Sequence, residues 1–159
     1  MRALIYVSLI FLMLSCSDNT GNKLPAFTAY TLSGKKIDTK HLAGKIVVIK
    51  IWATWCGSCV KEIPDLNALV EKYKNDSSIV FLSITEDNRE KIELFLTKRP
   101  FAYEHITDAK KLQDRFYGGL SQEIPKHLVV DKNGNIVFDK SGELPNIALL
   151  LSTKIDEIK

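Results

Sequence analysis

The sequence predicts an α/β fold in which a mixed β-sheet carries helices on both faces. Three observations lead to this prediction. Strand-like apolar runs alternate with segments whose apolar residues recur at helical spacing. The C-terminal third adds a hairpin signal followed by an amphipathic segment. A Cys-x-x-Cys motif follows the most apolar run and opens a helical pattern. The length of 159 residues, with 45% hydrophobic and 26% charged residues, indicates one globular domain.

The first elements are predicted to be a hairpin and a central strand. Residues 27–32 and 35–37 flank the turn signal Ser33-Gly34, which is typical of a short hairpin. The segment from Ile46 to Trp52 is rich in β-branched residues, as expected for a strand that is buried on both faces. The motif directly after it therefore lies at the end of a central strand.

A helix and a second strand are expected next. The helix runs from about Cys56 to Tyr73, with apolar residues at helical spacing. Pro64 is expected to kink this helix because proline lacks the backbone N–H and clashes with the preceding turn. The apolar segment from Ile79 to Thr85 is the next predicted strand.

The alternation continues through the second half of the chain. Asp87-Asn88-Arg89-Glu90 looks like a capping box, and the helix that it opens must end before Pro100. Residues 103–106 predict a strand. Thr107 or Asp108 is expected to cap a further helix, which ends at Gly118-Gly119.

The last elements are a hairpin and a helix. Residues 126–130 and 136–139 are predicted to pair across the turn 131–134, and an amphipathic helix follows from Pro145. This order of elements, with Trp-Cys-x-x-Cys at the end of the first long strand, is that of the thioredoxin fold. The predicted fold class is therefore an α/β thioredoxin fold with an N-terminal hairpin and a strand-helix insertion before Pro125.

The segment Trp55-Cys56-Gly57-Ser58-Cys59 predicts thiol–disulfide exchange. The sulfur of Cys56 lies at a helix N-terminus, where unpaired N–H groups and the helix dipole favour a thiolate. The thiolate is the form that attacks disulfides. Cys59 follows one helical turn later, close enough to resolve a mixed disulfide. We therefore expect a redox-active Cys56–Cys59 disulfide, with Cys56 as the attacking thiol.

The N-terminus predicts export and lipid anchoring. Arg2 precedes a 12-residue apolar run, Ala3 to Leu14, which is shorter than the ~20 residues that a membrane-spanning helix needs. This run has the length of a signal-peptide core. The sequence Met13-Leu14-Ser15-Cys16 resembles a bacterial lipobox, although Met13 stands where leucine is usual. An ordinary cleaved signal peptide and an uncleaved anchor are the alternatives.

The cysteine count agrees with lipidation. The chain has three cysteines, so that a lipidated Cys16 and one redox pair leave none over. The predicted division is a lipoprotein signal peptide over 1–15, a flexible tether over 16–23 and a thioredoxin-like domain over 24–159. We expect a periplasm-facing protein of the bacterial cell envelope. Ser17 after the lipidated cysteine favours the outer membrane, and the inner membrane is the alternative.

Several segments carry a family resemblance that spans 24–159. They are Leu42-Ala43-Gly44-Lys45 before the strand, Ala53-Thr54 before the motif, Lys61-Glu62-Ile63-Pro64 after it, the insertion between Thr85 and Gly119, Ile124-Pro125, and Leu128 to Gly134. With these segments the chain resembles the TlpA/ResA-like, membrane-associated thioredoxin family. The resemblance implies a redoxin-type oxidoreductase with antioxidant activity and no cofactor or metal. Its implied partners are protein thiols and disulfides of the envelope and an upstream membrane electron donor, and its implied direction is reduction.

The resemblance also implies roles for residues beside the cysteines. Pro125 is expected to be cis and to pack against the cysteine pair. Ile124 would present its backbone groups to an extended substrate, and Trp55 would contact that substrate. An ordinary trans proline at a strand start is the alternative for Pro125.

Two departures from the family pattern concern the redox chemistry. The family commonly has proline where this chain has Ser58, and the dipeptide between the cysteines tunes the reduction potential. Thioredoxins often have a buried aspartate where this chain has Lys50. Because ResA-like proteins place a glutamate just after the next strand, the resemblance implies that Glu86 accepts the Cys59 proton and pairs with Lys50. The alternative leaves Lys50 at a sheet end and Glu86 in a solvated loop.

Other function classes are weaker matches. A peroxidase of this fold would place a Pro-x-x-x-Thr-x-x-Cys pattern around the reactive cysteine, and Ala53 stands at the threonine position. A copper chaperone would need a third ligand, for which His127 is the candidate, whereas His41 and His105 are expected on the surface. The formal net charge of +3 is small and dispersed, which disfavours a nucleic-acid partner.

Overall fold

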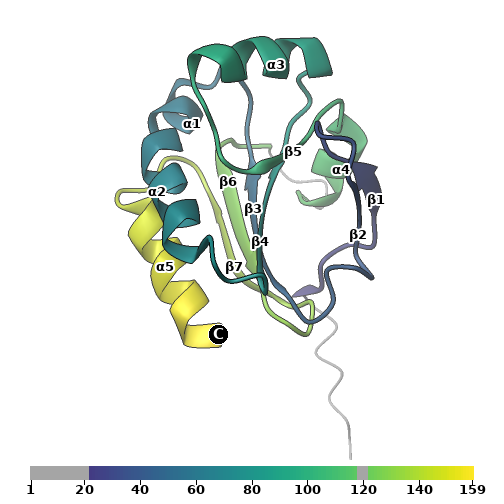
Figure 1. Ribbon diagram of the computed structural model, residues 1–159, viewed down its shortest axis with the longest axis vertical. Helices are drawn as coiled ribbons and strands as arrows, with labels where there is room; N and C mark the ends of the chain where they lie inside the picture. The colour runs from purple at the N-terminus through teal and green to yellow at the C-terminus, as the bar shows by residue number, and fades with distance from the viewer. Residues whose placement is uncertain (1–21, 118–121) are drawn as a thin grey trace, which may run out of the picture.

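The computed structural model describes residues 22–117 and 122–159, and a five-stranded sheet lies at its centre (Figure 1). The strands of this sheet are β3 (Ile46–Ile51), β4 (Ile79–Ile84), β5 (Glu104–Ile106), β6 (Lys126–Val130) and β7 (Ile136–Ser141). Their order is β5-β4-β3-β6-β7. Strands β3, β4 and β5 are parallel, whereas β6 is antiparallel to both of its neighbours. The predicted mixed sheet is therefore confirmed.

Among the described residues, a separate hairpin and five helices complete the fold. The hairpin consists of β1 (Thr28–Tyr30) and β2 (Lys36–Asp38), and Gly34 turns the chain between them with a φ of 83°. The helices are α1 (Gly57–Lys61), α2 (Ile63–Tyr73), α3 (Arg89–Lys98), α4 (Lys110–Arg115) and α5 (Ile147–Ile158).

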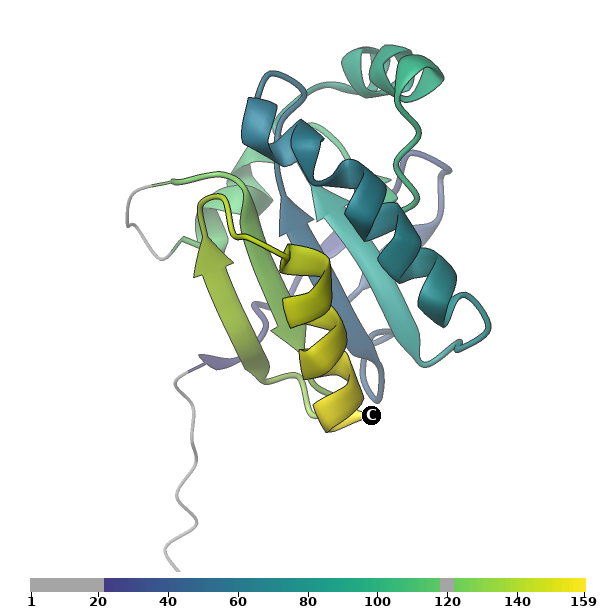
Figure 2. The same cartoon turned by 90° about the vertical axis from the view of Figure 1, so that its left-hand side faces the viewer.

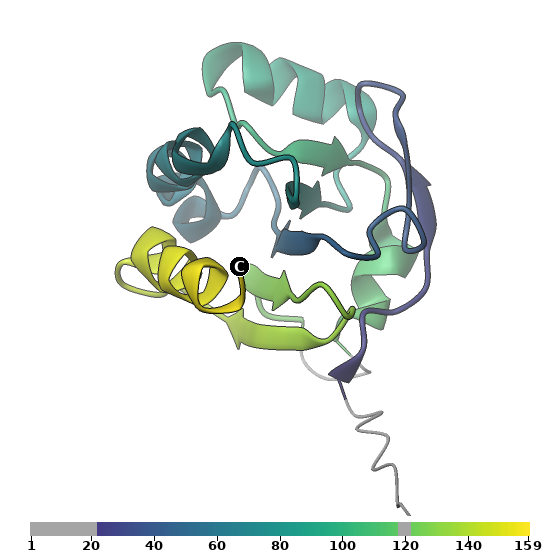
Figure 3. The same ribbon diagram turned by 60° about the horizontal axis from the view of Figure 1, so that its bottom comes forward.

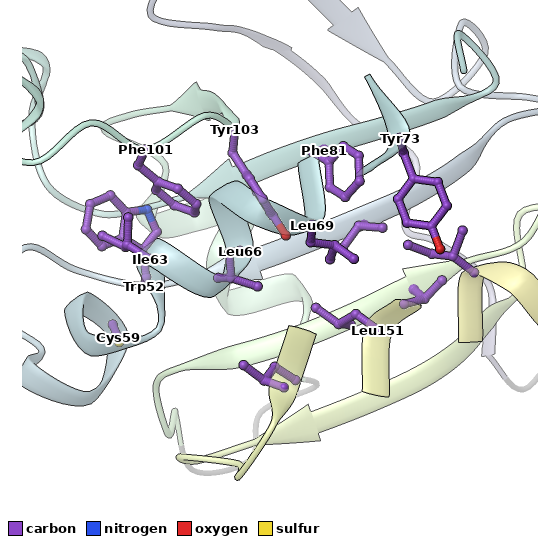
Figure 4. Packing of buried hydrophobic residues seen from close by; sticks show 14 of the residues in the cluster. Trp52, Cys59, Ile63, Leu66, Leu69, Tyr73, Phe81, Phe101, Tyr103 and Leu151 are labelled. Carbon is purple, nitrogen blue, oxygen red and sulfur yellow. The ribbon is translucent and has the colours of Figure 1, made fainter. Parts of the chain in front are cut away.

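The sheet separates two apolar clusters. Helices α1, α2 and α5 cover one face, and α4 with the β1–β2 hairpin covers the other (Figures 1 and 3). Figure 2 shows α2 and α5 side by side on their face, with α3 beyond the ends of β3 and β4. Aromatic residues from three other segments join α2 in the first cluster, namely Trp52, Phe81, and Phe101 with Tyr103 (Figure 4). Both faces of the sheet are therefore covered, as in other sheets that are flanked by helices.

Strand β3 lies in the middle of this arrangement, and all six of its residues are buried. Ile46 and Val48 point into the cluster under α2 and α5, whereas Val47 points into the cluster under the hairpin. Lys50 belongs to the first set by this alternation and is fully buried. A lysine in such a place needs a carboxylate partner.

The expected helix from Cys56 to Tyr73 is broken rather than only kinked. Helix α1 ends at Lys61, Glu62 lies between the helices, and α2 starts at Ile63. Pro64 therefore occupies the first turn of α2, where its missing N–H leaves no hydrogen bond unmade. The break turns the Glu62 side chain into the protein interior, where it is 6% exposed.

Two smaller predictions need correction. The N-cap of α4 is Ala109 and not Thr107 or Asp108, since Asp108 has a φ of 53° in the left-handed region. Asn22 and Lys23, expected in the tether, are held on the turn between β6 and β7 by hydrogen bonds to Ile136 O and Asn133 O. The expected stop at Gly118-Gly119 lies outside the described residues.

The packing of α2 generates a stability prediction. Leu66 is fully buried between α2 and the sheet (Figure 4). We expect Leu66→Ala to lower the free energy of unfolding by about 2–5 kcal/mol, because it removes buried methyl groups and leaves a cavity. Denaturant unfolding measures this loss. Leu149→Ala on α5 is the matched control, because Leu149 is 65% exposed. Equal losses for both variants would contradict the described packing.

Candidate redox site

The two cysteines of the motif form a disulfide at the C-terminal end of β3. Their Sγ atoms are 2.03 Å apart, and their Cα atoms are 5.2 Å apart. Cys56 is the N-cap of α1, and its Sγ accepts a hydrogen bond from the N–H of Cys59 at 3.2 Å. Cys56 is 7% exposed, whereas Cys59 is fully buried. A partner disulfide can therefore reach Cys56 more easily than Cys59.

The backbone N–H of Cys59 is one of the groups at a helix start that have no partner within the helix. Its bond to the sulfur of Cys56 would strengthen if that sulfur carried the negative charge of a thiolate. The hydroxyl of Ser58 lies 3.5 Å from the same sulfur. The departure from proline at this position thus places a second polar group beside Cys56.

A buried aspartate fixes the loop that leads into the motif. The carboxylate of Asp87 accepts a hydrogen bond from the N–H of Thr54 at 2.7 Å and contacts Lys91 Nζ at 2.5 Å. Burial alone would raise the pKa of Asp87, but the hydrogen bond from Lys91 and those from Thr54 outweigh it and lower the pKa. The ionised carboxylate therefore ties the loop between β4 and α3 to Thr54, the residue two positions before Cys56. The sequence analysis placed Asp87 in a capping box, but the N-cap of α3 is Asn88, and the bond from Thr54 to Asp87 was not predicted.

The cis-proline expectation is confirmed as a structural fact. The peptide bond between Ile124 and Pro125 is cis, and Pro125 O accepts a hydrogen bond from Gly142 N at 2.8 Å. Pro125 is buried, and Ile124 is half-buried. Ile124 packs against the cluster that contains both cysteines. The proline loop and the cysteine motif therefore adjoin the same apolar cluster.

An apolar groove adjoins the motif. It has a volume of about 760 Å³, and its lining includes Trp55, Val60, Arg99 and Pro100. Trp55 is 64% exposed, which is unusual for a large aromatic side chain. An exposed indole beside a reactive disulfide is typical of a binding surface.

Three buried ionisable residues form a hydrogen-bonded network beneath the motif. The Oε2 atom of Glu62 lies 2.5 Å from Lys50 Nζ and 3.0 Å from His127 Nε2. Lys50 and His127 are directly opposite each other on the paired strands β3 and β6. Both side chains are fully buried. Glu62 follows Cys59 by three residues, which places both on one side of α1 and its C-terminal cap.

The environment shifts the pKa of each group in the network. Burial alone would raise the pKa of Glu62, but the hydrogen bond from His127 and the charge of Lys50 lower it. Burial lowers the pKa of Lys50, with Glu62 opposing the shift. Burial also lowers the pKa of His127, against the hydrogen bond to Glu62. At neutral pH Glu62 is therefore ionised and His127 is neutral, and the 2.5 Å contact between Lys50 Nζ and the ionised carboxylate is the geometry of an ion pair.

This geometry overturns the expected Lys50–Glu86 pair. Lys50 is paired with Glu62, and Glu86 is exposed on the loop after β4. The physical reason is that Glu86 and Asp87 alternate in direction, so that Asp87 points inward and Glu86 toward solvent. The break between α1 and α2 instead delivers Glu62 to Lys50. Its place three residues after Cys59 was the available signal in the sequence.

The expectations for two histidines also need correction. His105 was expected on the surface but is buried, with Nδ1 2.6 Å from Ser83 Oγ and Nε2 3.0 Å from Phe101 O. His127 was considered only as a metal ligand, and its Nε2 atom is engaged by Glu62. Within 22–117 and 122–159, no three His, Cys, Asp or Glu residues are grouped as a metal site.

The predicted lipidation site lies outside the described residues. Cys16, the signal peptide over 1–15 and most of the tether precede Asn22, where the description begins. In the part of the chain that is described, no helix has the length and apolar content needed to cross a membrane.

Known proteins resemble this chain in sequence and in fold. A ResA thiol-disulfide oxidoreductase from Bacillus anthracis is 30% identical over 123 residues, which cover 77% of this chain and 70% of that protein. The thioredoxin-like protein YneN of Bacillus subtilis (strain 168) is 28% identical over 118 residues, which cover 73% and 68%. A thioredoxin family thiol:disulfide interchange protein from Chlorobium tepidum TLS superposes with a TM-score of 0.74 over 86% of this chain and 95% of the other. At 23% identity, that likeness shows the fold alone.

The thioredoxin fold is thus established, and the relatives together with the Cys56–Cys59 disulfide establish thiol–disulfide oxidoreductase activity. The pattern of the AhpC/TSA family matches residues 20–139, which include both cysteines and the cis-proline. The chain therefore belongs to the AhpC/TSA family.

Proposed function

We propose that this protein reduces disulfides of other proteins in the bacterial cell envelope. The difference in exposure between the two cysteines is the observation that carries this proposal, since Cys56 is reachable and Cys59 is enclosed. In the reduced protein, the Cys56 thiolate attacks one sulfur of a substrate disulfide. A mixed disulfide forms, and the other substrate sulfur leaves as a thiolate, which takes a proton from solvent.

Cys59 completes the reaction in this proposal. Its thiol loses a proton, and the resulting thiolate attacks Cys56 Sγ in the mixed disulfide. The Cys56–Cys59 bond forms, and the second substrate sulfur leaves as a thiolate. Two electrons have then passed from the cysteine pair to the substrate. The proposed upstream electron donor in the membrane restores the dithiol by the reverse exchange.

The surface around Cys56 supports binding of an extended polypeptide. Trp55 offers an exposed aromatic face beside the groove, and Ile124 lies on the cis-proline loop. We propose that Trp55 packs against substrate side chains and that the backbone of Ile124 pairs with the substrate strand. Pro125 holds that backbone in place.

Location in the envelope is proposed from the N-terminal sequence. An apolar run that ends in Ser15-Cys16 supports a lipoprotein signal peptide, with the mature chain anchored through acylated Cys16. Two or three acyl chains give stable membrane attachment. Ser17 supports the outer membrane as the destination, and the inner membrane is the alternative.

The two other function classes are disfavoured by the residues around the motif. A peroxidase of this fold would need a threonine where this chain has Ala53. The disulfide partner of Cys56 is Cys59, only three residues away. A copper chaperone would need His127 grouped with both cysteines, and no such three-ligand group is found within residues 22–117 and 122–159. Metal content after purification separates the chaperone from the oxidoreductase.

The roles of the two cysteines lead to a trapping prediction. We expect Cys59→Ser to accumulate mixed disulfides with envelope proteins through Cys56, because the resolving thiol is missing. Electrophoresis without reductant, followed by release with dithiothreitol, measures these adducts. Cys56→Ser is the matched control and should trap few partners. If both variants trap partners equally, the assignment of roles is wrong.

The lipid anchor leads to a second prediction. We expect the wild-type protein, expressed in a bacterial host that makes lipoproteins, to have a mass of residues 16–159 plus acyl groups. Cys16→Ala should accumulate as the unprocessed precursor, because the acylated cysteine is required before cleavage. Intact mass spectrometry of the membrane fraction measures both. Ser15→Ala keeps a small residue before Cys16 and is the control. A mature wild-type protein without acyl groups would contradict lipidation.

A further inference from the structure

The network of Lys50, Glu62 and His127 contains two acceptor atoms that accept no hydrogen bond from any described residue. Among the residues that the structure describes, Glu62 Oε1 and His127 Nδ1 are buried and have no hydrogen-bond partner. Buried polar atoms without partners are rare and destabilising, so that they often mark a functional site. Both atoms belong to the same three-residue cluster, and Cys59 lies one helical turn before Glu62.

The hydrogen bonds determine which nitrogen of His127 carries the proton. The pKa of Glu62 is lowered, so that its carboxylate is ionised at neutral pH and only accepts hydrogen bonds. His127 Nε2 must therefore donate to Glu62 Oε2 at 3.0 Å. In a neutral imidazole the other nitrogen is then unprotonated. His127 Nδ1 is thus a buried, unpartnered lone pair that can take up a proton.

The charges of the network decide which member gains a proton most easily. A proton on Glu62 would break the ion pair and leave Lys50 as an isolated buried cation, which is unfavourable. A proton on His127 keeps the Lys50–Glu62 pair and adds an imidazolium that Glu62 stabilises. The network then has a net charge of +1, which balances a thiolate on Cys59.

The other groups that face this network do not supply a better acceptor. Tyr103 has a buried hydroxyl whose pKa is raised by burial and by the charge of Glu62, so that it stays protonated. Lys140 lies opposite His127 on β7, and its side chain is exposed. Helix α5 presents the apolar residues Ile147 and Leu151 to this face of the sheet.

We propose that His127 takes up the proton of the Cys59 thiol during resolution, with Lys50 and Glu62 as positioning residues that hold its ring in the accepting tautomer. The proposal rests on the proposed function and deepens it. The proton leaves Cys59 Sγ and is retained in the network, ending on His127 Nδ1. The Cys59 thiolate then attacks Cys56 Sγ and expels the substrate thiolate. The imidazolium returns its proton to solvent or to the leaving sulfur, and the network is again neutral.

His127 makes no substrate contact of its own in this scheme, so that its effect is confined to one step. His127 lies on β6, two residues after Pro125, and its side chain is fully buried. The attack by Cys56 on a substrate does not use the network. Removal of His127 should therefore slow resolution and leave the first attack unchanged.

Stopped-flow mixing of the reduced protein with one equivalent of 5,5′-dithiobis(2-nitrobenzoate) separates the two steps. Attack by Cys56 releases one coloured thiolate, and attack by Cys59 on the mixed disulfide releases the second. We expect His127→Gln to slow the second release ~100-fold at pH 7, the usual effect of losing a buried base. Its rate should then rise about tenfold per pH unit, because hydroxide must replace the base. Glutamine keeps a donor toward Glu62 but accepts no proton at neutral pH.

His105→Gln is the matched control. His105 is also buried on this sheet, on β5 rather than β6, but both of its ring nitrogens already have partners. It should change neither release. A normal first release with an unchanged second release in His127→Gln would overturn this proposal alone. A first release that persists in Cys56→Ser would overturn the proposed function as well.

A second measurement uses the wild-type protein, so that it tests the proposal even if His127→Gln does not fold. We expect the NMR titration midpoint of His127 to move to higher pH on reduction, because a Cys59 thiolate stabilises the imidazolium. Reduced Cys59→Ser should show no such movement. Identical midpoints in oxidised and reduced wild-type protein would overturn the proposal.

Discussion

Burial of β3 on both faces is the constraint on which the rest of the structure depends. Its six residues are enclosed between two apolar clusters, which fixes its place at the centre of the sheet. The disulfide-bearing loop leaves from its C-terminal end, so that the position of Cys56 is set by the most enclosed element of the fold. The same burial encloses Lys50, whose charge must then be neutralised nearby.

The break between α1 and α2 supplies the carboxylate that neutralises Lys50. Proline at position 64 is incompatible with a continuous helix but fits the first turn of a new one. Glu62 lies at the junction and faces inward, where it meets Lys50 from β3 and His127 from β6. One short irregularity thus links the helix that carries the cysteines to two strands of the sheet. Such an ion pair costs desolvation, and its value lies more in positioning charge than in net stability.

Electrostatics divides the site into an outer and an inner part. The outer part contains Cys56, which caps a helix and receives the N–H of Cys59. These are conditions that favour a thiolate. The inner part contains the enclosed Cys59 and the ionisable network, where an unpaired charge is unfavourable. Asp87 fixes the loop before Cys56 by accepting a hydrogen bond from the N–H of Thr54.

The sequence by itself determined the elements and the location of the chemistry, whereas the tertiary structure alone decided which side chains meet Lys50. The β-branched run of β3 and the turn between β6 and β7 are local signals that gave their elements in the expected place, and the apolar period gave α2, although the helix is broken at Glu62. The Cys-x-x-Cys motif is equally local, since a helical turn brings its two sulfurs together regardless of the surroundings. The family resemblance correctly indicated the cis bond before Pro125.

The contact between Lys50 and His127 instead depends on the pairing register of β3 and β6, which lie far apart in the sequence. Glu62 rather than Glu86 supplies the carboxylate because a helix break redirects one side chain and a single-residue alternation turns the other outward. Long-range pairing and side-chain direction at loops are collective outcomes of packing, so that the network became visible only in the folded chain.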